Sequence, residues 1–289
     1  MIYIQIKAGL GNQMFEYAFG RALSLEQGKP LALDLSWYDN HAGRDTPRKY
    51  LLDKYNIQAR IAVPREIEKF NTPLKKLLRK IYRRLVYKKD NVYRASLMKS
   101  RGSYFEGHWA NERFFKKHKD VIRADLSLKY PLTAFSSSVL SEIKTYKEKG
   151  FATVSVHVRR GDCVTNPHAA SYQGTVDTSY YDKSYEYLVE KFGEEKLVFF
   201  IFSDDIEWAR ANVLTKAKTT CVSRPEIPDY EELYLMTQCD NHVIANSTFS
   251  WWGAWLNANP DKIVIAPKQW LKDTSFDTSD VCPKEWVRI

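Results

Sequence analysis

The stretch from Leu197 to Phe202, with the sequence LVFFIF, constrains the fold more than any other, because all of its residues are apolar. A strand with one face toward solvent alternates apolar and polar side chains, so an unbroken apolar run indicates a strand covered on both faces. Such strands belong to parallel sheets with helices packed on either side. The run therefore predicts an α/β fold.

Strand-like and helix-like segments alternate on both sides of this run. In the first half, residues 2–6 and 30–35 are predicted strands, and residues 13–27 are a predicted helix that ends at Gly28. In the second half, the predicted strands alternate with helices; the strands are 153–159, 197–202, 242–245 and 263–266. This alternation predicts two Rossmann-like domains with parallel sheets.

The two domains are predicted at residues 1–150 and 151–289, and a chain of 289 residues is long enough for both. A predicted helix over 135–149 ends at Gly150, which marks the junction. The last residues of the chain can pack back on the N-terminal domain.

The strand at 153–159 ends in a group of polar side chains, in the sequence TVSVHVRRGD. Its valines alternate with polar residues, so His157 and Arg159 share one face, and Arg160 and Asp162 follow in a turn. Ligands of open parallel sheets bind outside the carboxyl ends of strands, and the planar guanidinium fork matches phosphate oxygens. A surface arginine pair without a ligand is the simpler alternative.

Two further strand ends carry polar residues, Ser203 to Asp205 and Asn246 to Ser250. Helix capping explains either cluster on its own. In a parallel sheet, however, these ends face the same way as Arg159 and Arg160, and hydroxyl and N–H groups at a helix start can hold a phosphate. The convergence favours a diphosphate site.

A glycine-containing turn follows the first predicted strand, with the sequence AGLGNQ at residues 8–13. A strand, such a turn and a helix start direct backbone N–H groups toward an anion or a polar ligand. The dinucleotide fingerprint is incomplete, because Met14 stands where the third glycine would be. A tight turn without a ligand is the alternative interpretation.

Several classes of protein and site are excluded. No apolar run reaches the roughly 18 residues of a membrane span, and the N-terminus lacks the regions of a signal peptide. The cysteines show no metal-site spacing and are predicted to be reduced thiols of a cytosolic protein. Walker A, GxSxG and HExxH motifs are absent, so we expect arginine residues, and no metal or other cofactor, to neutralise a diphosphate. Three tryptophans at helical spacing are predicted core residues: Trp251, Trp252 and Trp255.

The net charge of +9 is concentrated in one segment. Residues 75–89 hold eight basic residues and no acidic one, so the rest of the chain lies near +1, which excludes a generally basic nucleic-acid-binding protein. The apolar residues from Leu74 to Val86 recur at helical spacing and predict an amphipathic helix. Either its apolar stripe packs on the N-terminal domain, or the helix (74–89) lies on an anionic membrane surface.

Three motifs together resemble the bacterial α-1,2-fucosyltransferases of glycosyltransferase family 11. They occur in matching order and spacing over nearly the whole chain, as GLGNQMFEYAFGRAL, HVRRGD and ELYLMTQCDNHVIANSTFSWWGAWL. The resemblance implies a GT-B fold, in which two Rossmann-like domains face a cleft. It also implies metal-independent, inverting transfer from GDP-β-L-fucose to O2 of a terminal galactose, in surface polysaccharide or O-antigen synthesis.

The resemblance further implies roles for individual residues. Arg159 is expected on the β-phosphate with support from Arg160, while His157 and the carboxylate of Glu232 are expected to read guanine. The remaining donor-binding residues are expected to be Asp204, Asn246, Ser247, Thr248 and Phe249. From the other domain, the residues expected to approach the fucose are Gly9, Gly11, Asn12 and Gln13.

The general base does not transfer from relatives. The α-1,6 relatives place a glutamate just beyond HVRR, where this chain has Pro167 and His168. Asp162 is the first candidate for a catalytic base, and His168 and Glu16 are the alternatives.

Two other functions stay open: a fucosyltransferase of another linkage, α-1,6 or protein O-linked, and a non-catalytic nucleotide- or membrane-binding protein. The stretch over 36–135 shows no clear period for much of its length and is expected to shape the acceptor site. The acceptor is expected to be a galactoside glycan, which can be lipid-linked. The expected location is the cytoplasm, with peripheral attachment to the inner face of the cytoplasmic membrane.

Overall fold

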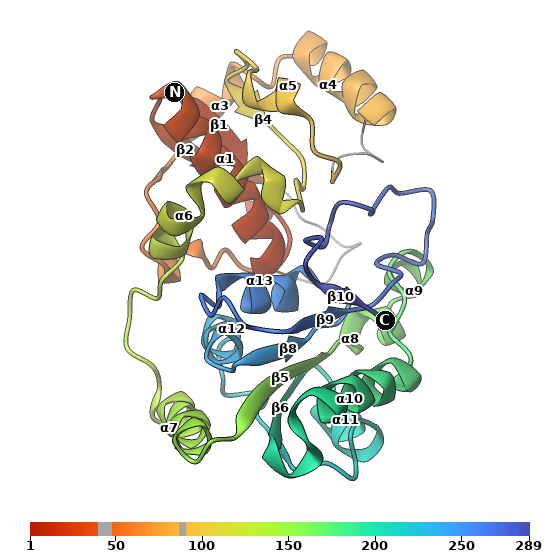
Figure 1. The fold of residues 1–289 in the computed structure, drawn as a ribbon. Helices are drawn as coiled ribbons and strands as arrows, with labels where there is room; N and C mark the ends of the chain where they lie inside the picture. The colour runs from red at the N-terminus through yellow and green to blue at the C-terminus, as the bar shows by residue number, and fades with distance from the viewer. Residues whose placement is uncertain (40–47, 87–90) are drawn as a thin grey trace. The chain divides into compact units, whose positions relative to one another are not determined.

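The computed structural model describes residues 1–39, 48–86 and 91–289. These residues form two compact units (Figure 1). Unit 1 consists of Met1–Tyr130 and Thr274–Pro283, and unit 2 consists of Pro131–Asp273 and Lys284–Ile289.

Unit 1 is built on a small parallel sheet with the strand order β3-β2-β1-β4. The strands are β1 (Ile2–Gln5), β2 (Leu31–Asp34), β3 (Arg60–Ile61) and β4 (Tyr104–Phe105). Helix α1 (Leu10–Gln27) connects β1 to β2 and packs closely on β1, since a Cβ at Gly20 would collide with the Ile4 side chain. The helix ends at Gly28 in the left-handed conformation (φ 59°), as predicted.

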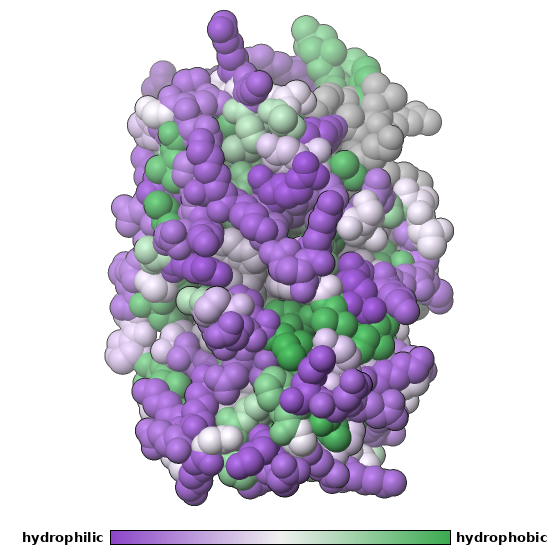
Figure 2. All heavy atoms as spheres, in the orientation of Figure 1, coloured by the Kyte–Doolittle hydropathy of each residue, from purple (hydrophilic) through white to green (hydrophobic). Residues whose placement is uncertain are grey.

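The other helical segments of unit 1 are short, apart from α4 (Pro73–Val86). They are α2 (Ser36–Asp39), η1 (Leu52–Lys54), α3 (Pro64–Glu68), α5 (Ala95–Met98), η3 (Glu112–Phe114), η4 (Lys116–His118) and α6 (Lys119–Asp125). The predicted amphipathic helix (74–89) is confirmed as α4 over 73–86, and 87–89 lie outside the described residues. Among its described apolar side chains, Leu74, Leu77, Leu78 and Ile81 are exposed rather than packed on the rest of unit 1, and hydrophobic side chains gather on the surface at α4 (Figure 2).

Unit 2 contains a larger parallel sheet with the strand order β10-β9-β8-β5-β6-β7. The strands are β5 (Ala152–Val158), β6 (Leu197–Ser203), β7 (Thr219–Cys221), β8 (Asn241–Val243), β9 (Val264–Ala266) and β10 (Val287–Arg288). Counted within the unit, this order is 3-2-1-4-5-6, which is the order of a doubly wound Rossmann sheet. The predicted α/β class is confirmed. The chain has two Rossmann-like units, as expected for a GT-B fold.

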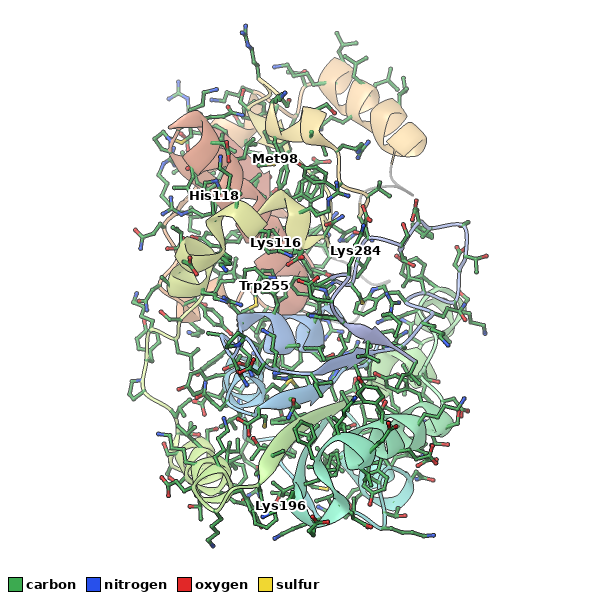
Figure 3. The ribbon with its side chains drawn as sticks, viewed as in Figure 1. Met98, Lys116, His118, Lys196, Trp255 and Lys284 are labelled. Carbon is green, nitrogen blue, oxygen red and sulfur yellow. The ribbon has the colours of Figure 1, made fainter. Side chains whose placement is uncertain are left out.

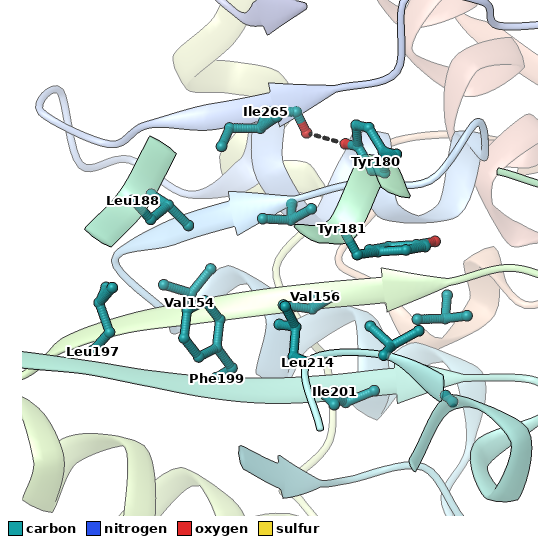
Figure 4. Packing of buried hydrophobic residues seen from close by; sticks show 14 residues of the cluster. Val154, Val156, Tyr180, Tyr181, Leu188, Leu197, Phe199, Ile201, Leu214 and Ile265 are labelled. Atoms are coloured by element: carbon teal, nitrogen blue, oxygen red, sulfur yellow. Dashed lines mark hydrogen bonds between the residues drawn. The ribbon is translucent and has the colours of Figure 1, made fainter. Parts of the chain in front are cut away.

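Strand β6 lies at the centre of the core, as its apolar sequence predicts. All of its residues are buried. Phe199 and Ile201 pack with Tyr181 and Leu188 of α10 (Thr178–Phe192) on one face of the sheet (Figure 4). Val198, Phe200 and Phe202 pack on the opposite face with side chains from two other helices, α7 (Ala134–Glu148) and α12 (Asp229–Thr237).

The remaining helical segments of unit 2 are α8 (Gly161–Thr165), α9 (Pro167–Tyr172), η5 (Glu194–Lys196), α11 (Ile206–Asn212) and α13 (Thr248–Leu256). Trp251 and Trp252 of α13 are fully buried, and Trp255 (Figure 3) is nearly so. The prediction that these tryptophans belong to the core is confirmed.

The boundary between the units differs from the predicted junction at residue 150, since unit 2 begins at Pro131. The physical reason is the packing of α7: its residues Val139 and Ile143 are buried against β6 and α12. Gly150 ends this helix with a positive φ, but it does so inside unit 2. Near the end of the chain, residues 274–283 belong to unit 1, while β10 pairs with β9 in unit 2.

Candidate active site

The strand order of unit 2 reverses between β5 and β8, which are neighbours in the sheet although β6 and β7 lie between them in sequence. Ligands of doubly wound sheets bind at this switch point, just outside the carboxyl ends of the strands. The predicted residues His157 to Arg160 stand at the end of β5, and Asn246 to Phe249 follow β8. The topology thus brings the two predicted clusters to the same place.

Asp204, just beyond β6, binds the turn that follows β5. Its Oδ1 atom accepts the backbone N–H groups of Arg160 and Gly161 at 2.8 and 3.0 Å. Its Oδ2 atom lies 3.2 Å from Nη1 of Arg159, whose side chain is 17% exposed. A Cβ atom at Gly161 would lie 2.5 Å from the same carboxylate, so this approach requires glycine. Asp204 therefore fixes both the turn and the guanidinium of Arg159.

Arg160 is held by different partners. Its Nε atom donates to Oδ2 of Asp205 at 3.2 Å, and its guanidinium lies 3.7 Å from the centroid of the Trp208 ring. Asp205 also caps α11 by accepting the N–H of Trp208. Capping thus explains Asp205, whereas Asp204 serves the β5 turn, so the predicted cluster splits into two functions.

His157 is 6% exposed, and its Nδ1 atom lies 2.9 Å from Oγ of Ser250 in α13. Burial lowers the pKa of His157 to about 4; nearby Asp204 opposes this shift and Arg159 adds to it. The imidazole is therefore neutral at physiological pH. Its ring is 5.7 Å from that of Phe249. In this geometry His157 positions the start of α13, and its contact with guanine stays a prediction.

Among the residues after β8, Asn246 and Ser247 form hydrogen bonds within the fold, whereas Thr248 and Phe249 are partly exposed. Asn246 is 4% exposed and its Nδ2 donates to the backbone oxygens of Gln173 and Gly174 at 3.1 and 3.3 Å. Ser247 caps α13 by accepting the N–H of Phe249. Thr248 and Phe249 are half-buried and are the members of this cluster with surface left for a ligand. A pocket of about 540 Å³ lies beside the cluster, lined by Asn246 together with residues of the α9–α10 connection and of 267–272.

Glu232 lies in the first turn of α12 and is mostly buried. Burial raises the pKa of its carboxyl to about 7; a hydrogen bond with Ser223 opposes the shift, and the charges of Asp229 and Asp204 add to it. The Ser223 hydroxyl also accepts the backbone N–H of Ser203 at 2.9 Å, which ties the Glu232 region to the end of β6. Perturbed carboxyl groups of this kind are frequent at functional sites.

In unit 1, the turn after β1 differs from the predicted one, because α1 begins at Leu10 rather than near Gln13. Ala8 carries the positive φ of the turn (58°) and Gly9 is the N-cap residue. Gln13 is buried and cross-links the loop, since its Nε2 donates to the backbone oxygens of Ala8 and Lys49. Gly11 and Asn12 thus lie in the first helical turn, and their approach to a sugar stays a prediction.

Of the three candidates for the general base, Glu16 is the one whose side chain the structure describes. Glu16 is fully buried and accepts the backbone N–H of Lys7 at 2.9 Å. Burial also raises its pKa well above the usual range, despite the opposing charge of Lys7. A carboxyl in this setting cannot contact an acceptor hydroxyl and supports the β1–α1 turn instead. The side chains of Asp162 and His168 lie outside what the structure describes.

Sequence reasoning missed Trp208 and Ser223. Trp208 lies in the first turn of α11, three residues after the predicted Asp205. An N-cap residue accepts the N–H of the residue three positions later, so this spacing could have indicated Trp208. Ser223 follows β7, a strand of three residues that carries no clear pattern. Within the described residues, no group of three or more histidine, cysteine or acidic side chains is arranged to hold a metal ion.

A doubly wound unit with arginines, a carboxylate and a helix start at its switch point is typical of nucleotide-binding proteins of the Rossmann type. The family model described as Glycosyl transferase family 11 matches residues 1–289. The chain belongs to this family and is a glycosyltransferase.

Two curated bacterial relatives align over the whole chain. An Escherichia coli protein named Alpha-1,2-colitosyltransferase is 35% identical, with 100% of this chain and 99% of the relative covered. The O-antigen biosynthesis glycosyltransferase WbnK of Escherichia coli is 30% identical, with both chains fully covered. Human Galactoside alpha-(1,2)-fucosyltransferase 1 is 27% identical over 61% of this chain and 49% of its own length. Among solved structures, the fucosyltransferase NodZ from Bradyrhizobium is similar with a TM-score of 0.46 and 13% identity, covering 87% of this chain and 91% of NodZ.

Proposed function

We propose that the protein transfers L-fucose from GDP-β-L-fucose to O2 of a terminal galactose, with inversion at the anomeric carbon. The observation that carries this proposal is the pair of Arg159 and Arg160 at the switch point of unit 2, oriented by two carboxylates and placed beside the start of α13. The α-1,2 linkage is supported by the relatives that share the family, whose names include α-1,2-colitosyl and α-(1,2)-fucosyl transfer.

The proposed chemistry is dominated by charge on the leaving group. As the sugar departs in an oxocarbenium-like transition state, negative charge grows on the GDP diphosphate. The guanidinium of Arg159 is preset by Asp204 and meets that charge without reorganisation. One preorganised donor of this kind is worth about 3 kcal/mol in the transition state, or roughly a hundredfold in rate.

Guanine recognition is assigned to Glu232 under this proposal. An ionised carboxylate accepts both the N1–H and the exocyclic amine of guanine, and adenine does not present this pair of donors. The carboxyl of Glu232 is mostly buried, so its bonds with guanine would be shielded from water. The Ser223 hydroxyl interacts with this carboxyl and connects it to the end of β6.

GDP-colitose is a second candidate donor, because the relative with 35% identity is named a colitosyltransferase. Colitose is fucose without the hydroxyl at carbon 3, so both donors offer the same nucleotide and leaving group. We propose fucose as the natural donor sugar and GDP-colitose as the donor to compare with it.

The acceptor is proposed to be a terminal galactose of a surface glycan, such as an O-antigen unit. WbnK, which covers the whole chain, is named for O-antigen biosynthesis. An acceptor of this kind can be lipid-linked, and the enzyme would then work at the inner face of the cytoplasmic membrane. No helix in the described parts of the chain is long and apolar enough to cross a bilayer.

The test is a turnover assay with GDP-fucose and GDP-colitose against lactose and the type 1 and type 2 disaccharides. We expect release of GDP with GDP-fucose, and a product whose NMR spectrum shows an α-1,2 linkage to galactose. Faster turnover with GDP-colitose would show that colitose, and not fucose, is the natural donor sugar. An α-1,6 or other linkage in the product would show that the acceptor position is not O2 of galactose. GDP binding without turnover on any galactoside would refute the proposal as a whole.

A further inference from the structure

Helix α4 presents its apolar stripe to solvent. Leu74, Leu77, Leu78 and Ile81 are 66, 53, 56 and 49% exposed, and Figure 2 shows hydrophobic side chains gathered at α4. These residues fall at positions i, i+3, i+4 and i+7, so they form one face of the helix. Scattered exposed leucines need no explanation, but four large apolar side chains on one helix face indicate a surface that is covered by a partner.

The contacts that hold α4 to unit 1 come from a different face. Arg79 donates to the backbone oxygen of Phe70 and to Oδ1 of Asn71, both at 2.7 Å. Its guanidinium also lies 4.9 Å from the centroid of the Tyr104 ring, and its Nε atom lies 3.5 Å from Oε1 of Glu106. The helix is therefore docked through a basic side chain, and its apolar stripe points elsewhere.

The charged residues in the sequence of α4 are all basic. The sequence of α4 holds six basic residues and no acidic one: Lys75, Lys76, Arg79, Lys80, Arg83 and Arg84. Lys75 is exposed, and its Nζ atom donates to the backbone oxygen of Lys69, so its charge remains at the surface. A protein partner with mixed charges would leave several of these groups unmatched. An anionic lipid surface suits such a sequence, because headgroup phosphates accept from cations such as Lys75 while Leu74, Leu77, Leu78 and Ile81 enter the acyl boundary.

We propose that α4 is an interfacial helix that attaches the protein to an anionic bilayer surface, with Leu74, Leu77, Leu78 and Ile81 inserted below the headgroups. Attachment would place the enzyme beside a lipid-linked acceptor, and this consequence rests on the proposed function. The attachment itself depends on α4 alone. Each basic residue near such a surface strengthens binding by about fivefold, and this gain falls as salt rises.

The experiment is co-sedimentation of the full chain with vesicles of phosphatidylcholine and with vesicles that also contain phosphatidylglycerol. In the charge variant, Lys76, Lys80, Arg83 and Arg84 are each replaced by Gln, which keeps helix propensity and leaves Arg79 in place. In the apolar variant, Leu74, Leu77, Leu78 and Ile81 are each replaced by Gln. In the matched control, four exposed lysines of unit 2 are replaced by Gln; they are Lys144, Lys191, Lys196 (Figure 3) and Lys216.

We expect the wild type and the control variant to bind the phosphatidylglycerol vesicles equally, and to be released by salt. The charge variant should bind about several hundredfold more weakly, from four fivefold losses, and the apolar variant should also lose binding. Turnover of a soluble acceptor should be unchanged in all variants, which separates attachment from the proposed catalytic function. Wild-type protein that ignores anionic vesicles at low salt would overturn the proposal. So would equal loss of binding in the control variant, or an α4-dependent dimer in sedimentation velocity that hides the stripe.

Discussion

The pKa of Glu232 leads to a sharp prediction for GDP binding. The carboxyl must be ionised to accept the two guanine donors, but burial raises its pKa to about 7 in the free protein. We therefore expect GDP affinity to rise between pH 5.5 and 8. The Glu232→Gln variant should bind GDP weakly throughout this range and should lack the same rise.

The size of the effect follows from linkage. With a pKa of about 7, the carboxyl is about 90% ionised at pH 8 and about 3% ionised at pH 5.5. If guanine binds only the ionised form of Glu232, GDP affinity should fall by about thirtyfold from pH 8 to pH 5.5. His157, with a pKa of about 4, stays neutral over the whole range and adds nothing to the change.

The same pKa predicts the direction of a stability change. The folded pKa of Glu232 lies above its ordinary value of 4.5, so the neutral form stabilises the fold fully below about pH 4.5. This contribution is lost as the pH rises through 7. Glu232→Gln should therefore raise the free energy of unfolding at pH 8, by at most about 3 kcal/mol, and have little effect at pH 4.

The assay is calorimetric titration with GDP at each pH, with the wild type, Glu232→Gln and Glu226→Gln compared. Glu226 is an exposed glutamate of the same unit and serves as the matched control. The ionisation of the GDP phosphate is common to all three proteins, so the ratio of affinities isolates Glu232. A wild-type affinity that parallels that of Glu232→Gln at every pH would refute the assignment of the guanine site.

Three further predictions concern the diphosphate site. Arg159→Ala should fold but lose roughly a hundredfold or more in turnover, and Arg159→Lys should recover little of it because an ammonium cannot form the fork; near-normal turnover in either variant contradicts the proposed role. Asp204→Asn keeps an oxygen for the N–H groups of the β5 turn but frees the Arg159 guanidinium. GDP affinity, measured by calorimetry, should therefore hold or rise, while turnover, measured by steady-state kinetics, falls by about tenfold. A parallel loss of affinity and turnover would contradict the proposed role of Asp204 in orienting Arg159. Turnover should survive EDTA, because Asp204 and Asp205 are already paired with arginines; activity that disappears with EDTA and returns with Mg²⁺ or Mn²⁺ would show the opposite.

The central strands could be predicted from the sequence because burial on both faces leaves a direct signature. Every residue of β6 is apolar up to Ser203, and the valines of β5 alternate with residues that include His157. Since parallel strands share one edge for their carboxyl ends, the sequence alone was enough to expect Arg159 and Asp204 near each other. The ion pair between them bears out that expectation.

The remaining features depend on contacts that no local pattern contains. Strands β3 and β10 have two residues each, which is too short for a period to appear. The boundary at Pro131 follows from the packing of α7 against β6, a contact between segments far apart in the chain. The orientation of α4 was open for the same reason, because among its described side chains Arg79 and Lys75 make the polar contacts with the rest of unit 1, while the leucines are exposed.

Under the proposed function, the charges at the β5 turn favour catalysis without tight binding of the product. Arg159 and Arg160 are matched by Asp204 and Asp205, so these four side chains together carry no net charge. Under the proposed function, a diphosphate would meet oriented groups rather than a large positive field, and we expect its ground-state attraction to be moderate. The negative charge that develops on the diphosphate as the glycosidic bond breaks would face a guanidinium that is already held in position, so we expect the stabilisation to be greatest in the transition state. An unpaired arginine pair would bind GDP more tightly and would slow its release without a matching gain in the chemical step.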